Sequence, residues 1–130
     1  MAKSVLKCFG NDDVEGLKSL FCEEILSNIN NLDEQIEKVF DFYDGKSVSY
    51  GFINSPSQKS VRNGKTVSLK NNPLISYIKT DSGKEYAIKV YMYCINVSYP
   101  EKVGISKISV YTYNNEYELV LDAEIGELLD

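Results

Sequence analysis

Residues 89–97, KVYMYCINV, decide the fold class because two kinds of side chain alternate along them. In an extended strand, every second side chain points to the same face of the sheet. When the stretch is extended back by one residue, one of its faces carries the apolar side chains Ile88, Val90, Met92 and Cys94. The other face carries Lys89, Tyr91, Tyr93 and Ile95. The stretch therefore predicts a long strand that buries its first face and presents tyrosines on its second.

The flanking segments predict further antiparallel strands. Asn63-Gly64 and residues 81–83, Asp-Ser-Gly, are turn sequences typical of β-hairpins. Apolar residues recur with a period of two around these turns, which predicts more strands over residues 47–53, 73–80, 104–113 and 117–122.

The N-terminal third of the chain predicts helices instead. A short helix is expected over residues 3–9, and a second over residues 11–26 with Asp12 as its N-cap. A third helix, over residues 31–44 with Asn31 as N-cap, carries one apolar stripe of Leu32, Ile36, Val39, Phe40 and Tyr43. Helices followed by antiparallel strands predict an α+β fold, with the helices packed on one sheet face in a single domain over residues 1–130.

The composition excludes several classes of function. The chain has 130 residues, a formal net charge of −5 and no histidine, so it has no Ser-His-Asp triad, Cys-His pair or histidine metal site. No basic footprint is visible, which argues against binding nucleic acid. Cys8, Cys22 and Cys94 lack metal-site spacing and are expected to be buried free thiols, although pairing of Cys8 with Cys22 stays open. We therefore predict no metal and no cofactor.

The sequence contains no apolar run long enough to span a bilayer. No signal peptide is visible at its start. We therefore expect no membrane span in this chain.

The chain resembles the nuclear-transport-factor-2-like superfamily of cone-shaped α+β domains. Three features carry the resemblance: FGNDDVEGLKSLF at residues 9–21, the capped helix at 31–44 and the strand pairs at 74–113. More narrowly, it is similar to small uncharacterised bacterial domains, many from secreted or lipid-anchored proteins of Gram-positive bacteria. This likeness implies a cell-envelope location, extracellular or lipid-anchored if an N-terminal signal has been removed, and a cytoplasmic one otherwise.

The resemblance also implies a curved sheet that wraps the helices and leaves a pocket at the wide end of the cone. Relatives use such a pocket for isomerisation, dehydration, epoxide hydrolysis or simple binding. Their catalytic sets commonly join aspartate to histidine or tyrosine, and the lack of histidine prevents transfer of any complete set. A fold alone does not supply a function.

Four polar side chains at core-facing positions are candidates for a small-molecule pocket: Tyr43, Tyr50, Asn96 and Thr112. The alternative is that each simply reaches water or a backbone partner. Asp41 and Asp44 are the nearest carboxylates for catalysis, but both fit exposed helical positions more simply. A catalytic carboxylate would need burial beside the tyrosines to raise its pKa.

A second candidate site lies on the opposite sheet face. Its members share strand parity on residues 84–97 and 103–113: Lys89, Tyr91, Tyr93, Lys107, Tyr111 and Tyr113. Tyrosine is favoured at interfaces, so these residues predict a homodimer contact. The alternative is an ordinary outer face rich in tyrosine because of β propensity.

Together these patterns predict a non-catalytic module that binds a small ligand or another protein. The alternative is a small pocket enzyme of the isomerase, dehydratase or hydrolase type, using tyrosine and carboxylate groups.

Overall fold

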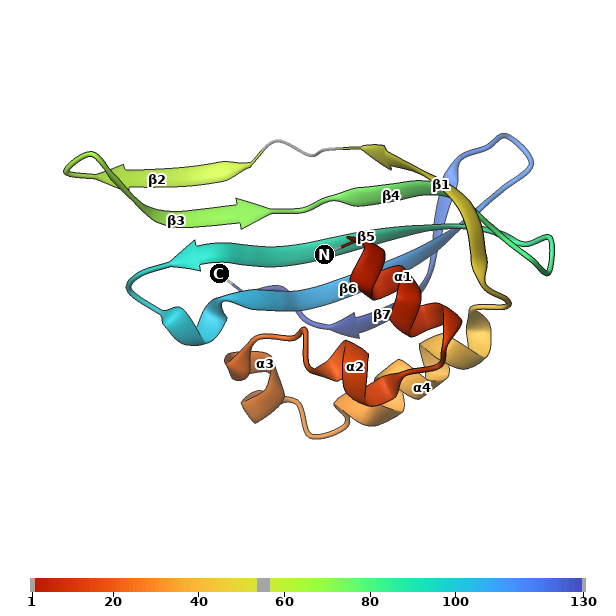
Figure 1. Cartoon of the computed structure of the whole chain (residues 1–130), viewed down its shortest axis with the longest axis horizontal. Coiled ribbons are helices and arrows are strands. Elements are labelled where there is room, and N and C mark those ends of the chain that lie inside the picture. Colours follow the sequence, from red (N-terminus) through yellow and green to blue (C-terminus); the bar gives the residue numbers. More distant parts are fainter. Residues whose placement is uncertain (1, 54–56, 130) are drawn as a thin grey trace.

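The computed structural model describes residues 2–53 and 57–129. Within these residues, four helices lie on one face of a seven-stranded antiparallel sheet (Figure 1), which confirms the α+β class. The helices are α1 (Ala2–Gly10), α2 (Val14–Lys18), α3 (Glu23–Asn28) and α4 (Leu32–Phe42). The strands are β1 (Ser47–Ile53), β2 (Gln58–Arg62), β3 (Lys65–Asn71), β4 (Leu74–Thr80), β5 (Glu85–Asn96), β6 (Gly104–Tyr113) and β7 (Leu119–Gly126). A short 3-10 helix, η1 (Pro100–Lys102), joins β5 to β6.

Strand β5 is the central element of the sheet. Its first half pairs with β4 and its second half with β3, while β6 pairs along its other side. Strands β1 and β2 extend the sheet beyond β4 and β3, and β7 pairs with β6. Strands β3 and β4 are separated by Asn72-Pro73, and the Pro73 carbonyl accepts a hydrogen bond from the Val90 N–H (3.0 Å). The sheet is therefore an antiparallel meander around β5.

The two hairpin turns form where the sequence predicts them. Asn63 and Gly64 have φ angles of 53° and 77°, as a two-residue turn with two positive φ angles requires. Gly83, in the turn between β4 and β5, has φ 85°. These conformations suit glycine and asparagine, which explains why the turn residues predict these hairpins correctly.

The predicted helix over residues 11–26 is wrong as a single element. The chain leaves helical geometry near Cys22, whose N–H donates to the Ile105 carbonyl (2.8 Å) at the start of β6. Gly104 permits this contact, because a Cβ atom there would lie only 3.1 Å from the Cys22 Cα. The segment therefore divides into α2 and α3, on either side of a backbone contact with the sheet.

One predicted N-cap, Asp12, is wrong, whereas Asn31 is the N-cap of α4 by position. Asp13 caps α2 by accepting a hydrogen bond from the Gly16 N–H (2.9 Å), whereas Asp12 takes a positive φ of 50°. Asn31 precedes α4 but makes no side-chain cap bond, and its Oδ1 accepts from the Gln35 side-chain amide (3.2 Å) instead. Both helices begin within two residues of the predicted caps. What differs from the prediction is the side-chain hydrogen bonding at these two helix starts.

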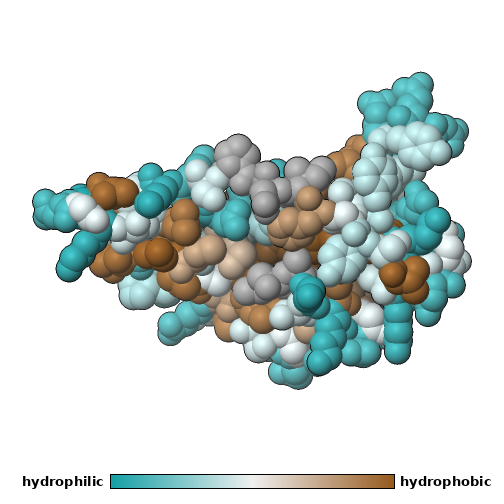
Figure 2. Space-filling model, turned by 45° about the horizontal axis from the view of Figure 1, so that its top comes forward, coloured by the Kyte–Doolittle hydropathy of each residue, from teal (hydrophilic) through white to brown (hydrophobic). Residues whose placement is uncertain are grey.

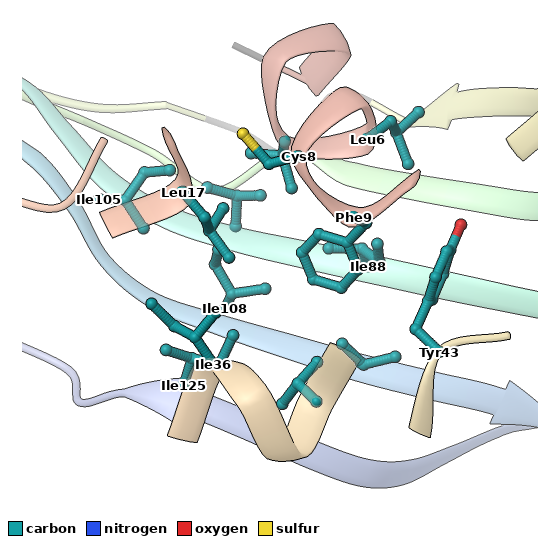
Figure 3. Close-up of a cluster of buried hydrophobic side chains, with 14 of the residues drawn as sticks. Leu6, Cys8, Phe9, Leu17, Ile36, Tyr43, Ile88, Ile105, Ile108 and Ile125 are labelled. Atoms are coloured by element: carbon teal, nitrogen blue, oxygen red, sulfur yellow. The ribbon is translucent and has the colours of Figure 1, made fainter. Parts of the chain in front are cut away.

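The core forms between α4 and the sheet, with α1 and α2 closing it (Figure 3). The predicted stripe of α4 is buried over its whole length, from Leu32 to Tyr43. Opposite it, Ile88 and Val90 of β5 and their partners on β6 are fully buried. The prediction that the first face of β5 meets the helices is therefore confirmed for this half of the strand.

The second half of β5 is different, because the helices do not extend over it. Strands β2 and β3 and residues 92–96 of β5 project beyond the helical layer (Figure 1), and we call this part the arm. Apolar side chains reach the surface along the arm in Figure 2. Met92 is only half-buried and Cys94 is exposed, so the predicted burial of Cys94 is wrong. Apolar residues continue to alternate along the second half of β5, but the helical layer that would bury them does not extend this far.

This difference predicts the reactivity of the three free thiols. Cys94 is expected to react with a thiol reagent within the native protein, whereas Cys8 and Cys22 are expected to stay unmodified. Burial raises the pKa of both the Cys8 and the Cys22 thiol, which further lowers their thiolate fraction. Brief labelling without denaturant, followed by peptide mass spectrometry, measures the relative reactivity of the three thiols. Labelling of the buried pair as fast as Cys94 would contradict the packing of α1 and α2 on the core.

Candidate functional site

The structure contains a large cavity with a volume of about 800 Å³. It opens where the C-terminal end of α4 meets the start of β1 and the turn between β4 and β5. Cavities of this size are typical of small-molecule sites. Its position makes it the candidate binding site of the domain.

Aromatic rings form the floor of this cavity. The ring centroids of Tyr43 and Tyr86 lie 4.5 Å apart, and Phe9 meets Tyr43 edge-on at 5.0 Å (Figure 3). Each of these three side chains is at most 4% exposed. Burial raises the pKa of the Tyr43 hydroxyl, which lies 2.6 Å from the Ser47 hydroxyl. The floor therefore consists of packed rings, and the Tyr43 hydroxyl stays protonated at neutral pH.

Tyr86 holds the end of α4 in place. Its hydroxyl accepts a hydrogen bond from the Asp44 N–H (3.0 Å) and donates one to the Phe42 carbonyl (3.3 Å). The bond to the Phe42 carbonyl satisfies one of the backbone acceptors that the C-terminal end of a helix leaves without partners. Sequence reasoning missed Tyr86, although it shares strand parity with Ile88 and Val90 and could have been found from that parity.

The turn between β4 and β5 fixes the loop that follows α4. Asp81 Oδ1 accepts from the Lys46 N–H (2.9 Å), and the Ser82 hydroxyl donates to the Asp44 carbonyl (2.9 Å). Gly45 lies between them with φ 94°, and a Cβ atom there would be 2.5 Å from Asp81 Oδ1. The close approach of loop and turn therefore depends on glycine, and it shapes the rim of the cavity.

Charged side chains surround the opening of the cavity. Five carboxylates and two ammonium groups line it: Asp12, Asp41, Asp44, Asp81, Glu85, Lys46 and Lys84. All seven residues are exposed to solvent. The rim therefore has an excess of negative charge above an aromatic floor.

The four predicted pocket residues do not lie together. Tyr43 and Thr112 both line the large cavity, and the Thr112 hydroxyl donates to the Asp122 carboxylate. Tyr50 lines a different cavity, between α1 and β1. Asn96 lies at the end of β5, where its Oδ1 accepts from the Tyr99 N–H (3.0 Å) in the following turn. The structure thus groups two of the four candidates and places the other two elsewhere.

The six interface candidates do share one face of the sheet, away from the helices, which we call the tyrosine face. Tyr91 is paired with Lys107 across strands, and Tyr111 with Ala87. The Lys89 and Lys107 ammonium groups lie 5.1 and 5.6 Å from the centroid of the Tyr91 ring. All six residues are half-buried. Cation–π contacts of this kind hold the long side chains against the sheet.

Other side chains complete this face, and sequence parity did not reveal them. Tyr77 stacks on Tyr113 with a centroid distance of 4.9 Å, at a position of β4 where the strand is irregular and φ is 47°. Its N–H donates to the Tyr113 hydroxyl (2.8 Å). The C-terminal residues Leu128 and Leu129 line a small cleft with Tyr91 and Tyr93. The C-terminal residues therefore lie beside two tyrosines of this face.

Two further features bear on function. Among residues 2–53 and 57–129, no group of three or more histidine, cysteine, aspartate or glutamate side chains is arranged to hold a metal ion. In the same part of the chain, no helix has the length and apolar character needed to cross a membrane.

Comparison with known proteins identifies a family for most of the chain. No curated protein matches the chain. A family model described as "Domain of unknown function (DUF5104)" matches residues 4–116. This range includes every helix and strand except β7 and the first two residues of α1. Because this match covers most of its length, the chain belongs to the family of DUF5104 domains.

Proposed function

We propose that this domain is a non-catalytic module that binds a small polar molecule in the cavity at the end of α4. The observation that carries the proposal is the combination of a cavity of about 800 Å³, a buried aromatic floor and a rim of charged groups. An apolar surface with a few converging polar groups is the usual construction of a ligand site.

Binding is favoured over catalysis by the exposure of the carboxylates. Each of the five carboxylates on the rim is solvent-exposed, so none has the burial that prepares a carboxylate for general acid–base work. The buried tyrosine hydroxyls also have partners, Ser47 for Tyr43 and the α4 backbone for Tyr86. An enzyme would need a reactive group that these contacts do not supply.

The charge of the rim predicts which ligands bind. Small organic cations, such as alkylammonium or guanidinium compounds, are expected to raise the melting temperature more than neutral or anionic compounds of equal size. Neutralising two rim carboxylates with Asp41→Asn and Glu85→Gln is expected to weaken cation binding by about tenfold, which is about 1.4 kcal/mol. Thermal denaturation with and without each compound, followed by titration calorimetry, measures both effects.

Glu37→Gln is the matched control, because Glu37 is an exposed carboxylate of α4 that does not line the cavity. This variant should bind cations as the wild type does. If no compound of any charge class binds at millimolar concentration, the cavity is not a ligand site and the proposal fails.

Self-association through the tyrosine face is a second candidate function. Tyr77, Leu119 and Leu121 are 57%, 41% and 49% exposed. Each of these side chains lies next to a tyrosine of this face on a neighbouring strand or in a ring stack. Apolar side chains grouped in this way often mark a protein contact. A two-fold homodimer would bury them against the same face of a second copy.

The homodimer predicts a clear effect of charge on this face. Tyr91→Glu with Tyr111→Glu would introduce four carboxylates into a two-fold contact and is expected to give folded monomers. Tyr99→Glu with Tyr117→Glu is the control, since both tyrosines are exposed and lie outside the tyrosine face. Sedimentation over a range of concentrations checks the result. A wild-type protein that stays monomeric at high micromolar concentration would exclude the homodimer.

A further inference from the structure

Strand β1 is an edge of the sheet that carries neither charge nor proline. Within the described residues it pairs only with β4, so its other side presents free backbone N–H and C=O groups. Its sequence, SVSYGFI, contains neither a charged residue nor proline. Proteins commonly protect edge strands with charged side chains. The other two edge strands have such charges: β2 carries Lys59 and Arg62, and β7 carries Asp122 and Glu124.

The side chains of β1 are apolar and accessible. Val48, Tyr50 and Phe52 are 64%, 41% and 50% exposed. Register shifts against β4 bend the strand, but they do not bury these three side chains. An extended segment paired with β1 could therefore bury apolar surface in addition to forming backbone hydrogen bonds.

A groove accompanies this edge. It has a volume of about 290 Å³ and lies between α1 and β1, with Leu6 and Tyr50 among its walls. Its charged side chains are Lys3, Lys7 and Lys46, and no carboxylate lines it within the described residues. In a chain of net charge −5, this is a locally basic groove next to an open strand. Only Gly10 and Lys46 also line the large cavity, so the two sites are largely separate.

We propose that β1 binds an extended acidic segment of a partner protein as an additional β-strand. The segment would pair with the free backbone groups of β1, and alternate side chains would point toward α1 because successive residues of a strand face opposite sides. Its carboxylates would point into the groove and meet Lys3, Lys7 and Lys46, with their methylene groups against Tyr50, while its apolar side chains would lie on the opposite face of the added strand. Backbone pairing supplies the affinity, and the lysines select for negative charge.

The test uses a fluorescein-labelled peptide of about ten residues, long enough for one strand, in which glutamate alternates with valine and isoleucine. A second peptide has glutamine in place of every glutamate. Fluorescence anisotropy should show saturable binding of the acidic peptide and binding weaker by about tenfold for the glutamine peptide. Amide hydrogen exchange should show new protection on β1 and none on β7.

Three variants locate the binding site. Lys3→Glu with Lys7→Glu reverses the charge of the groove, and Phe52→Lys places a charge on the edge, so each is expected to weaken binding about tenfold. Lys38→Glu is the control, because Lys38 is an exposed helical lysine of α4 outside the groove, and it should bind as the wild type does. Circular dichroism confirms that each variant is folded before binding is compared.

Several outcomes would overturn the proposal. One is the absence of saturable binding by the acidic peptide, and another is equal binding of the two peptides. Protection confined to β7 would assign the contact to the other edge. Concentration-dependent protection of β1 in the free protein would assign this edge to a second copy of the chain instead of a partner.

Discussion

Phe40→Ala is expected to lower the free energy of unfolding by about 3–5 kcal/mol, as truncation of a buried phenylalanine typically does. Phe40 is 7% exposed on the buried side of α4, and its ring meets Phe9 edge-on at a centroid distance of 5.2 Å. The variant would leave a cavity between α1 and α4 that the surrounding side chains fill only in part. Urea denaturation followed by circular dichroism measures the loss.

Phe42 gives a matched control on the same helix. It lies two positions further along α4 and is 37% exposed, so Phe42→Ala is expected to cost no more than about 1 kcal/mol. The comparison separates burial from the loss of an aromatic residue in a helix. Equal losses for the two variants would show that the buried face of α4 is assigned wrongly.

Gly126→Ala is expected to cost about 2–4 kcal/mol, because it combines backbone strain with overpacking. Gly126 has φ 79°, and a Cβ atom there would lie 2.1 Å from the Ser106 carbonyl oxygen. Its N–H also donates to Gln35 Oε1 (2.9 Å), which joins the end of β7 to α4. Relief of the clash would move a backbone segment of β6 or β7 and disturb this contact.

Gly83→Ala is the control for backbone strain alone. Gly83 has a similar φ of 85°, but a Cβ atom there would meet no atom within 4 Å. Its loss is expected to be about 1 kcal/mol, the cost of a left-handed conformation for a residue with a side chain. Denaturation midpoints compare the two variants, and equal costs would contradict the close contact between Gly126 and β6.

Features that depend on local chemistry were predicted well from the sequence. The stripe from Leu32 to Tyr43 identifies the buried face of α4 because helical spacing alone places these residues on one side. The turn at Asn63-Gly64 is predicted because these residue types tolerate the positive φ that a two-residue hairpin needs. In both cases, the residues nearby in sequence determine the conformation.

Features that depend on distant parts of the chain were predicted poorly. Cys94 continues the apolar parity of β5, but its burial depends on how far the helices extend over the sheet. The break between α2 and α3 depends on the approach of Gly104 to Cys22, across more than eighty residues of chain. Neither the end of the helical layer nor this contact leaves a periodic signal in the sequence.

The candidate site shows the same division. Parity and the end of the helical stripe suggested Thr112 and Tyr43, and both line the large cavity. Tyr50 and Asn96 satisfied the same parity argument, but the bent edge strand and the uncovered arm place them outside it. The acidic rim was missed because the fold brings together residues from a helix end and a distant hairpin turn.

The arm has a consequence for how the domain opens. Strands β2 and β3 are joined to the rest of the sheet mainly through pairing with the second half of β5, beyond the described helical layer (Figure 1). Segments with few buried apolar contacts undergo local unfolding at a lower free energy than the core. The domain is therefore expected to have two cooperative units, a stable one under the helices and a weaker one in the arm. Native-state amide exchange that is equally slow in both would show a single cooperative unit instead.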